Sequence, residues 1–290
     1  MSAPPPALGL LLDVDGPVSS PETRTVATEL LDDLHALLTA GIPVVLNTGR
    51  SDTFVTDRIL APLIDAGLPT GARLHAICEK GGVWTTADRE DPGEIHVDPA
   101  LTVPAVCHAL VRDLVDGSYG DAMFVDDTKR TMATVEARTD VPNAYYAERQ
   151  RAFDDDLLAA LTAAGLGIRI RERQIPDAEG RTPWRIDPSV IATDVESVAA
   201  GKALGARRAL QLLAADGPLP RAWQTVGDSR TDYTMADQLH VLGHDVTHVD
   251  VSPEGPRTDT PYRVLTVPGL TDDAAGAAHL HALTARLAHA

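Results

Sequence analysis

Short apolar runs alternate along this chain with longer stretches of helical periodicity, and this alternation constrains the fold more than any other feature. Residues 8–14 and 42–46 are continuous apolar runs, as in strands that are buried on both faces. Between them, residues 23–40 carry apolar side chains at helical spacing, and Gly41 ends the pattern. A strand–helix–strand rhythm indicates right-handed crossovers between parallel strands. We therefore expect an α/β fold with a parallel-sheet core.

The rhythm changes in the middle of the chain. Within residues 83–187 two short strands follow each expected helix, a pattern that favours an α+β layer with antiparallel pairing. The alternation then resumes with an expected helix over residues 195–215, a strand over 222–226 and a last helix over 272–288. The expected organisation is a core domain in two parts, with an inserted α+β domain between them. These three segments are residues 1–82, 83–187 and 188–290.

Composition excludes several classes of function. The formal net charge of −17 argues against nucleic-acid binding, because a polyanion would be repelled. No run of about 18 apolar residues is present, so we expect no membrane span. The first residues carry no basic segment ahead of an apolar run, so no signal peptide is expected and a cytoplasmic location is the default.

The first candidate for chemistry is the sequence Asp13-Val14-Asp15-Gly16 at the end of the first apolar run. Residues two apart on an extended strand face the same side, so both carboxylates point toward one site. Parallel sheets bind ligands at the carboxyl ends of their strands, which is where this pair lies. One carboxylate can attack phosphorus while the other protonates the leaving oxygen. Taken alone, the motif would equally fit a solvated turn or a cation-binding loop.

Two further segments could hold a phosphoryl group. Thr48 and Gly49 follow the second apolar run, and a hydroxyl with exposed backbone N–H groups can bind phosphate oxygens there. Gly49 lets the backbone approach a ligand closely. Lys202 is expected on the helix of residues 195–215, where its ammonium could offset charge between phosphoryl group and nucleophile. Helix capping by the threonine and simple solvation of the lysine are the alternatives.

Asp228 and Asp232 follow a third apolar strand, within Gly227-Asp228-Ser229-Arg230-Thr231-Asp232. Carboxylates four residues apart at a strand-to-helix turn can approach one hard cation, and Mg²⁺ prefers oxygen ligands. A bound cation would also reverse the local negative potential that a phosphorylated substrate meets on this acidic chain. Helix capping by either aspartate is the alternative. Together, the four signals predict one site, because each falls at the carboxyl end of an expected strand or on the adjacent helix.

In this combination and order, the motifs resemble the haloacid dehalogenase (HAD) superfamily of phosphatases. The Thr-Gly-Arg form and the long insert resemble its Cof-type and sugar-phosphatase members, which have a large α/β cap of type C2B. Glu79-Lys80-Gly81-Gly82 also resembles the Glu-Asn-Gly-Ala segment that leads into such caps. The resemblance implies a Rossmann-like core and Mg²⁺-dependent hydrolysis of a small phosphate ester, with a sugar phosphate favoured.

The resemblance also implies a role for each residue. Asp13 would form an aspartyl-phosphate, and Asp15 would protonate the leaving alcohol and then activate water. Thr48, Gly49 and Lys202 would bind the phosphoryl oxygens. The implied Mg²⁺ ligands are Asp13, the backbone carbonyl of Asp15, Asp228 and, directly or through water, Asp232.

The sequence gives fewer indications of which residues contact the substrate. Arg50, Lys129 and Arg130 are candidate cations for a polar substrate, the last two lying between expected strands of the inserted domain. A solvated hairpin turn would explain Lys129 and Arg130 equally well.

Three residues depart from the pattern of the superfamily. Pro17 stands where a threonine is usual, Thr231 where an asparagine is frequent, and Ala203 where a glycine is usual. None removes a required charged group, but they leave two alternatives open. One is a sugar phosphomutase that uses the same aspartyl-phosphate, and the other is a weakly active metabolite-binding or regulatory protein.

Overall fold

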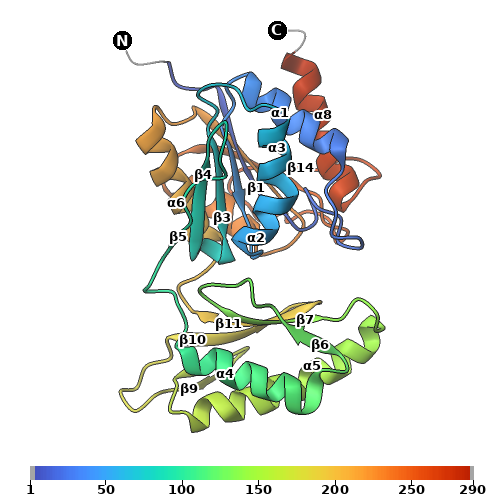
Figure 1. Cartoon of the computed structure of the whole chain (residues 1–290). Helices are drawn as coiled ribbons and strands as arrows, with labels where there is room; N and C mark the ends of the chain where they lie inside the picture. The colour runs from blue at the N-terminus through green and yellow to red at the C-terminus, as the bar shows by residue number, and fades with distance from the viewer. Residues whose placement is uncertain (1–3, 288–290) are drawn as a thin grey trace. The chain divides into compact units, whose positions relative to one another are not determined.

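The computed structural model describes residues 4–287, which form two compact units (Figure 1). One unit contains the residues up to His96 together with those from Gly201 onward, and the other contains Val97–Ala200. The chain therefore leaves the first unit once and returns to it. In the described part of the chain, no helix has the length and apolar character needed to cross a membrane.

The first unit contains an eight-stranded sheet in the order β14-β13-β12-β1-β2-β3-β4-β5 within the described residues. Pairing is parallel from β14 through to β3, and β4 pairs antiparallel with β3. The α/β class with a parallel-sheet core is thus confirmed. The strands are β1 (Leu8–Leu12), β2 (Val44–Asn47), β3 (Leu74–Cys78), β4 (Val83–Ala87), β5 (His96–Val97), β12 (Ala222–Gly227), β13 (Asp245–Asp250) and β14 (Arg263–Leu265).

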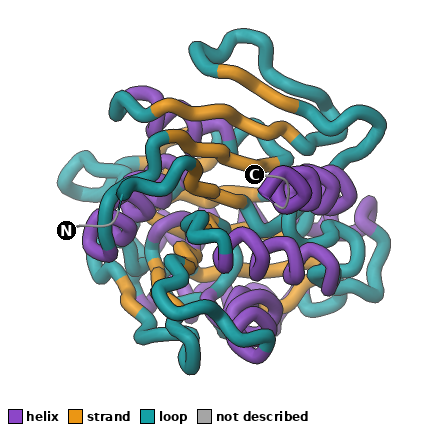
Figure 2. The backbone as a smooth tube through the Cα atoms, turned by 90° about the horizontal axis from the view of Figure 1, so that it is seen from above, coloured by secondary structure: helices purple, strands orange, loops and turns teal. Residues whose placement is uncertain are grey.

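Helices lie on both faces of this sheet (Figure 2). Successive side chains of its central strand point to opposite faces. Leu10 and Leu12 of β1 pack in one apolar cluster, with α1 (Thr28–Thr39) and α8 (Asp272–Leu287). Leu11 points the other way, into a second cluster with α6 (Lys202–Asp216) and α7 (Tyr233–Val241). The continuous apolar runs of the sequence therefore arise because both faces are buried.

One helical segment covers the first face without a break, although its hydrogen bonding changes along its length. It runs through α2 (Asp52–Val55), a π-helical turn (Thr56–Leu60) and α3 (Ala61–Asp65). Ser51 caps its start, because the Ser51 Oγ accepts the Phe54 N–H at 3.3 Å. The expected last helix is present as α8; its expected end at Ala288 lies outside the described residues.

The second unit contains a six-stranded sheet in the order β6-β7-β11-β10-β8-β9, with antiparallel pairing except between β8 and β10. Apolar side chains of the sheet pack against α4 and α5, which lie along one of its faces (Figure 1). The elements are α4 (Ala105–Leu114), a π-helical turn (Val115–Tyr119), β6 (Met123–Val125), β7 (Ala133–Ala137), α5 (Asn143–Ala163), β8 (Ile168–Ile170), β9 (Arg173–Ile175), β10 (Trp184–Pro188) and β11 (Ala192–Ser197).

The division between the units differs from the expected insertion of residues 83–187. The first strand assigned to the insertion, β4, pairs with β3 and so extends the sheet of the first unit. At the other end, β11 pairs with β10 and β7 and so belongs to the second unit. Hydrogen bonding across strands decides the boundary at each end, and this long-range pairing is not visible in local composition.

The prediction of a helix over residues 195–215 was wrong at its start for a related reason. Residues 195–197 belong to β11, and the helix begins only at Lys202, after Gly201. Val195 and the residues around it are apolar enough to fit either element, and pairing with β7 and β10 selects the strand. This correction moves Lys202 from the interior of a helix to the first residue of α6.

Candidate active site

The chain segments just after β1, β2 and β12, together with the start of α6, bring the candidate catalytic residues of the first unit together. Asp13 directly follows β1, Thr48 follows β2, and Asp228 follows β12. These three strands are neighbours and run parallel, so their carboxyl ends lie at one edge of the sheet. The same reasoning, applied to the sequence, predicted that these residues lie close together.

Asp13 is held in a buried position. Its N–H donates to the Val226 carbonyl at 2.9 Å, and its Oδ1 accepts the Val14 N–H at 2.6 Å. The residue is only 6% exposed. Burial and the charge of Asp232 raise the pKa of Asp13 well above its usual value, although Lys202 opposes the rise. Additional positive charge at the site would therefore favour the ionised form of Asp13.

Lys202 places its ammonium between two of the carboxylates. Nζ lies 2.5 Å from Asp13 Oδ1 and 2.8 Å from Asp232 Oδ1, and it donates to the Asn47 carbonyl at 2.8 Å. Burial alone would lower the pKa of Lys202, but the two carboxylates outweigh that effect and raise it. The same ammonium lowers the pKa of Asp232 against the opposing effect of burial. Lys202 and Asp232 are therefore both charged near neutral pH.

Asn47 is a residue of this site that the sequence analysis did not single out. Its Nδ2 donates to the Lys202 carbonyl at 3.0 Å, which reciprocates the bond from Lys202 Nζ to the Asn47 carbonyl. The side chain is fully buried against Gly205, where an added Cβ would lie 1.9 Å from Asn47 Oδ1. The pair fixes the start of α6 against the end of β2. Its only sequence signal was a polar residue at the end of an apolar strand.

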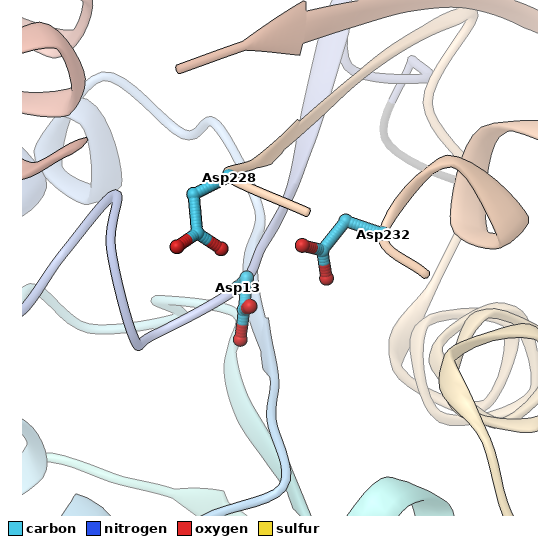
Figure 3. Close-up of side chains that lie close together, drawn as sticks. All are labelled: Asp13, Asp228 and Asp232. Carbon is cyan, nitrogen blue, oxygen red and sulfur yellow. The ribbon is translucent and has the colours of Figure 1, made fainter. Parts of the chain in front are cut away.

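Asp228 and Asp232 complete an acidic cluster with Asp13, and the three side chains lie close together (Figure 3). Each offers one carboxylate oxygen, and these oxygens lie within 4.8 Å of one another. Burial and the charge of Asp232 raise the pKa of Asp228 to about 7. Hard oxygen ligands at this spacing fit Mg²⁺, whose charge would also oppose the burial and the repulsion that raise the two pKa values.

Two local features hold these carboxylates in place. Asp232 Oδ2 accepts hydrogen bonds from the Ser229 N–H at 3.0 Å and the Ser229 hydroxyl at 2.6 Å. Gly16 has a φ of +86°, and a Cβ there would lie 2.4 Å from the Asp228 carboxyl carbon. Glycine is therefore required after the first aspartate pair, because only glycine permits both this backbone conformation and this close approach.

Thr48 and Gly49 form the turn after β2. Thr48 is fully buried, its N–H donates to the Ile77 carbonyl at 2.9 Å, and its Oγ1 accepts the Arg50 N–H at 3.1 Å. An added Cβ on Gly49 would meet only the Lys80 side chain, at 3.6 Å. Packing therefore does not require glycine at position 49. The expected close approach of a ligand to the Gly49 backbone stays a prediction.

Asp15 and Arg50 form an ion pair beside this cluster. Arg50 Nε lies 2.9 Å and 3.0 Å from the two oxygens of Asp15, and Nη2 lies 2.7 Å from Oδ1. The Asp15 side chain is 38% exposed and that of Arg50 is 10% exposed. Arg50, which the sequence suggested as a substrate contact, is therefore engaged with the candidate acid in this structure.

A strained turn connects the segments that carry the candidate phosphate-binding residues. Glu79 and Lys80 have positive φ values of 48° and 53°, which side chains larger than glycine seldom adopt. The Glu79 N–H donates to the Arg50 carbonyl and the Lys80 N–H to the Thr48 carbonyl, at 3.0 and 2.9 Å. The Lys80 carbonyl accepts the Gly201 N–H at 2.7 Å. These bonds link the end of β2 to the start of α6.

Lys129 and Arg130, the other candidates for substrate contact, lie in the second unit. They are on the connection between β6 and β7, where the sequence placed them. Thr128 and Asp126 shape this connection, because the Thr128 N–H and hydroxyl both bond to Asp126 Oδ1. A role for Lys129 and Arg130 in binding a substrate stays a prediction.

Comparison with solved structures places this architecture in a known fold. No family model and no curated protein sequence matches the chain. Its fold is that of the HAD-like hydrolases: it resembles a haloacid dehalogenase-like hydrolase from Bacteroides thetaiotaomicron with a TM-score of 0.60. That alignment covers 95% of this chain and 98% of the other at 10% identity.

Two further structures with the same fold have phosphatase or nucleotidase names. Aspergillus fumigatus trehalose-6-phosphate phosphatase aligns over 97% of this chain and 94% of its own, with a TM-score of 0.52 and 16% identity. ATP-bound IMP-nucleotidase from Plasmodium falciparum aligns over 96% of this chain and 60% of its own, with a TM-score of 0.55 and 12% identity. The HAD-type fold expected from the motifs is confirmed.

Proposed function

We propose that this protein is a Mg²⁺-dependent phosphomonoesterase of the HAD type that acts on a small phosphorylated metabolite. The observation that carries the proposal is the contact of Lys202 Nζ with both Asp13 and Asp232, next to Asp228. A buried nucleophile, a fixed cation and a cluster of oxygen ligands are what phosphoryl transfer requires at one point. A sugar phosphate is favoured as substrate, since trehalose-6-phosphate phosphatase is among the proteins of similar fold.

The first half-reaction in this proposal forms a covalent intermediate. An Asp13 oxygen attacks phosphorus, the bond from phosphorus to the ester oxygen breaks, and Asp15 gives its proton to the departing alcohol. Lys202 and Thr48 bind the phosphoryl oxygens while charge develops on them. Burial and the neighbouring carboxylates raise the pKa of Asp13, so a bound cation would favour its ionised, nucleophilic form.

The second half-reaction regenerates the protein. Asp15, now a carboxylate, takes a proton from water as the water attacks phosphorus, and the bond from phosphorus to Asp13 breaks. Inorganic phosphate leaves, and Asp15 is again protonated. Asp13, Asp228 and the Asp15 carbonyl would hold Mg²⁺, with Asp232 directly or through water. When bound, the ion would offset the negative charge of the phosphoryl group and of this acidic protein.

The proposal is tested by phosphate release from aryl and sugar phosphates with and without Mg²⁺. We expect EDTA to abolish release and Mg²⁺ to restore it. Burial raises the pKa of Asp228 to about 7, and the pKa of Asp13 is raised as well, so Mg²⁺ must displace at least one proton below pH 7. Its affinity should therefore fall at least about tenfold per pH unit as pH drops from 7. Calorimetry in two buffers of different ionisation enthalpy measures that proton release independently of turnover.

Two outcomes would contradict the proposal. If no phosphate ester yields phosphate with Mg²⁺ present, the enzyme assignment fails and a binding role is favoured. If the phosphoryl group moves to another position of a sugar and no phosphate is released, the phosphomutase alternative replaces hydrolysis.

A further inference from the structure

The contact between Arg50 and Asp15 has a geometry that a general electrostatic role does not require. Two nitrogens of the guanidinium reach the carboxylate, and Nε lies within 3.0 Å of both of its oxygens. Paired donors from a planar group restrict the rotation of a carboxylate, whereas a single point charge does not. The Asp15 side chain is 38% exposed, so packing restrains its rotamer less than it would that of a buried residue.

Arg50 is itself held rigidly from three directions. Its N–H donates to Thr48 Oγ1 at 3.1 Å, and its carbonyl accepts the Glu79 N–H at 3.0 Å. Its guanidinium carbon lies 4.8 Å from the centre of the Phe54 ring, a distance at which a cation is attracted to the aromatic face. The backbone and the side chain of Arg50 are therefore both fixed, so the guanidinium can in turn restrict the orientation of the Asp15 carboxylate.

We propose that Arg50 is a positioning residue, which orients the Asp15 carboxyl group toward the leaving oxygen and the attacking water. This inference rests on the proposed function, in which Asp15 is the acid and then the base. It differs from the sequence-based expectation, in which Arg50 contacts the substrate. A proton donor must lie within hydrogen-bond reach of the atom that receives the proton, so the orientation of Asp15 controls the step.

The test compares two aryl phosphates of similar shape. Phenyl phosphate has a basic leaving group that needs a proton, whereas dinitrophenyl phosphate has a leaving group that departs without one. The ratio kcat/KM reports events up to the first irreversible step, here cleavage of the ester bond. We expect Arg50→Met to lower kcat/KM about 10- to 100-fold for phenyl phosphate and less than about 3-fold for dinitrophenyl phosphate.

Three further variants separate positioning from charge and from general stability. Arg50→Lys keeps the charge but lacks the fork, so it should not restore turnover of phenyl phosphate. Phe54→Leu removes the aromatic support without touching Asp15, and a smaller loss with the same leaving-group dependence is expected. Arg58→Met removes an exposed arginine from the adjoining helical segment and should change neither substrate.

The outcomes are distinct from failure of the proposed function. If the wild-type protein hydrolyses neither ester, the phosphatase assignment is wrong. If it hydrolyses both, and Arg50→Met lowers kcat/KM equally for both, Arg50 binds the phosphoryl group or stabilises the fold and the inference is wrong. Full recovery with Arg50→Lys would likewise show that charge alone matters.

Discussion

Replacing Asp13 with asparagine is expected to lower kcat at least about 10⁴-fold for every phosphate ester that the protein hydrolyses. The amide is nearly the same size as the carboxyl group but is not a nucleophile for phosphorus. Because the residue is buried beside Asp228 and Asp232, the substitution also removes like-charge repulsion, so the protein should remain folded. Phosphate release under saturating substrate and Mg²⁺ measures the effect.

Asp57→Asn is the matched control, since Asp57 is an exposed aspartate of the same unit, outside the site. It should leave kcat unchanged. If Asp13→Asn retains more than a small fraction of wild-type turnover while Asp57→Asn behaves normally, another residue attacks phosphorus and Asp13 acts only as a metal ligand.

The second large effect is on stability and arises from Lys202. Lys202→Met removes the cation that contacts both Asp13 and Asp232 and leaves two buried carboxylates without it. Breaking a buried ion pair in this way typically costs about 3–5 kcal/mol of unfolding free energy. Urea unfolding followed by fluorescence can measure this loss, because the buried Trp223 lies in the same apolar cluster as α6.

Two further variants test whether unpaired charge causes the loss of stability in Lys202→Met. Arg207→Met removes an exposed cation from the same helix and should cost less than about 0.5 kcal/mol. Adding Asp232→Asn to Lys202→Met should recover part of the loss, because one uncompensated carboxylate is gone. A double variant as unstable as Lys202→Met would mean that lost packing of the lysine stem, and not unpaired charge, dominates.

Much of the fold was predictable because burial on both faces leaves a local signature. The continuous apolar runs of β1 and β2 marked central parallel strands, and the side chains that follow them were correctly placed at one edge. The ends of the second unit were missed because they depend on the pairing of β4 with β3 and of β11 with β10. Strand pairing between distant segments has no local pattern in one sequence.

The candidate site, like the fold, could be predicted from the sequence only in part. Charged residues with motif spacing, such as Asp13 and Asp228, could be found from the sequence because their chemistry is visible in their identity. Asn47 could not, because it acts by hydrogen bonds to and from Lys202, 155 positions away. The Glu79–Lys80 segment was noted only for its resemblance, because its contribution is made through backbone N–H and carbonyl groups. The partnership of Arg50 with Asp15 was also hidden, since it joins residues 35 positions apart by side-chain geometry alone.

The central claim, that Asp13 becomes phosphorylated during turnover, can be tested by trapping the intermediate. In Asp15→Asn the water-activating carboxylate is gone, while dinitrophenyl phosphate can still phosphorylate the protein without an acid. Acid quenching in the presence of Mg²⁺, followed by peptide mass spectrometry, should find the mass of one phosphoryl group on Asp13. Dinitrophenol release with no phosphorylated peptide, or a phosphoryl group on another residue, would contradict the account.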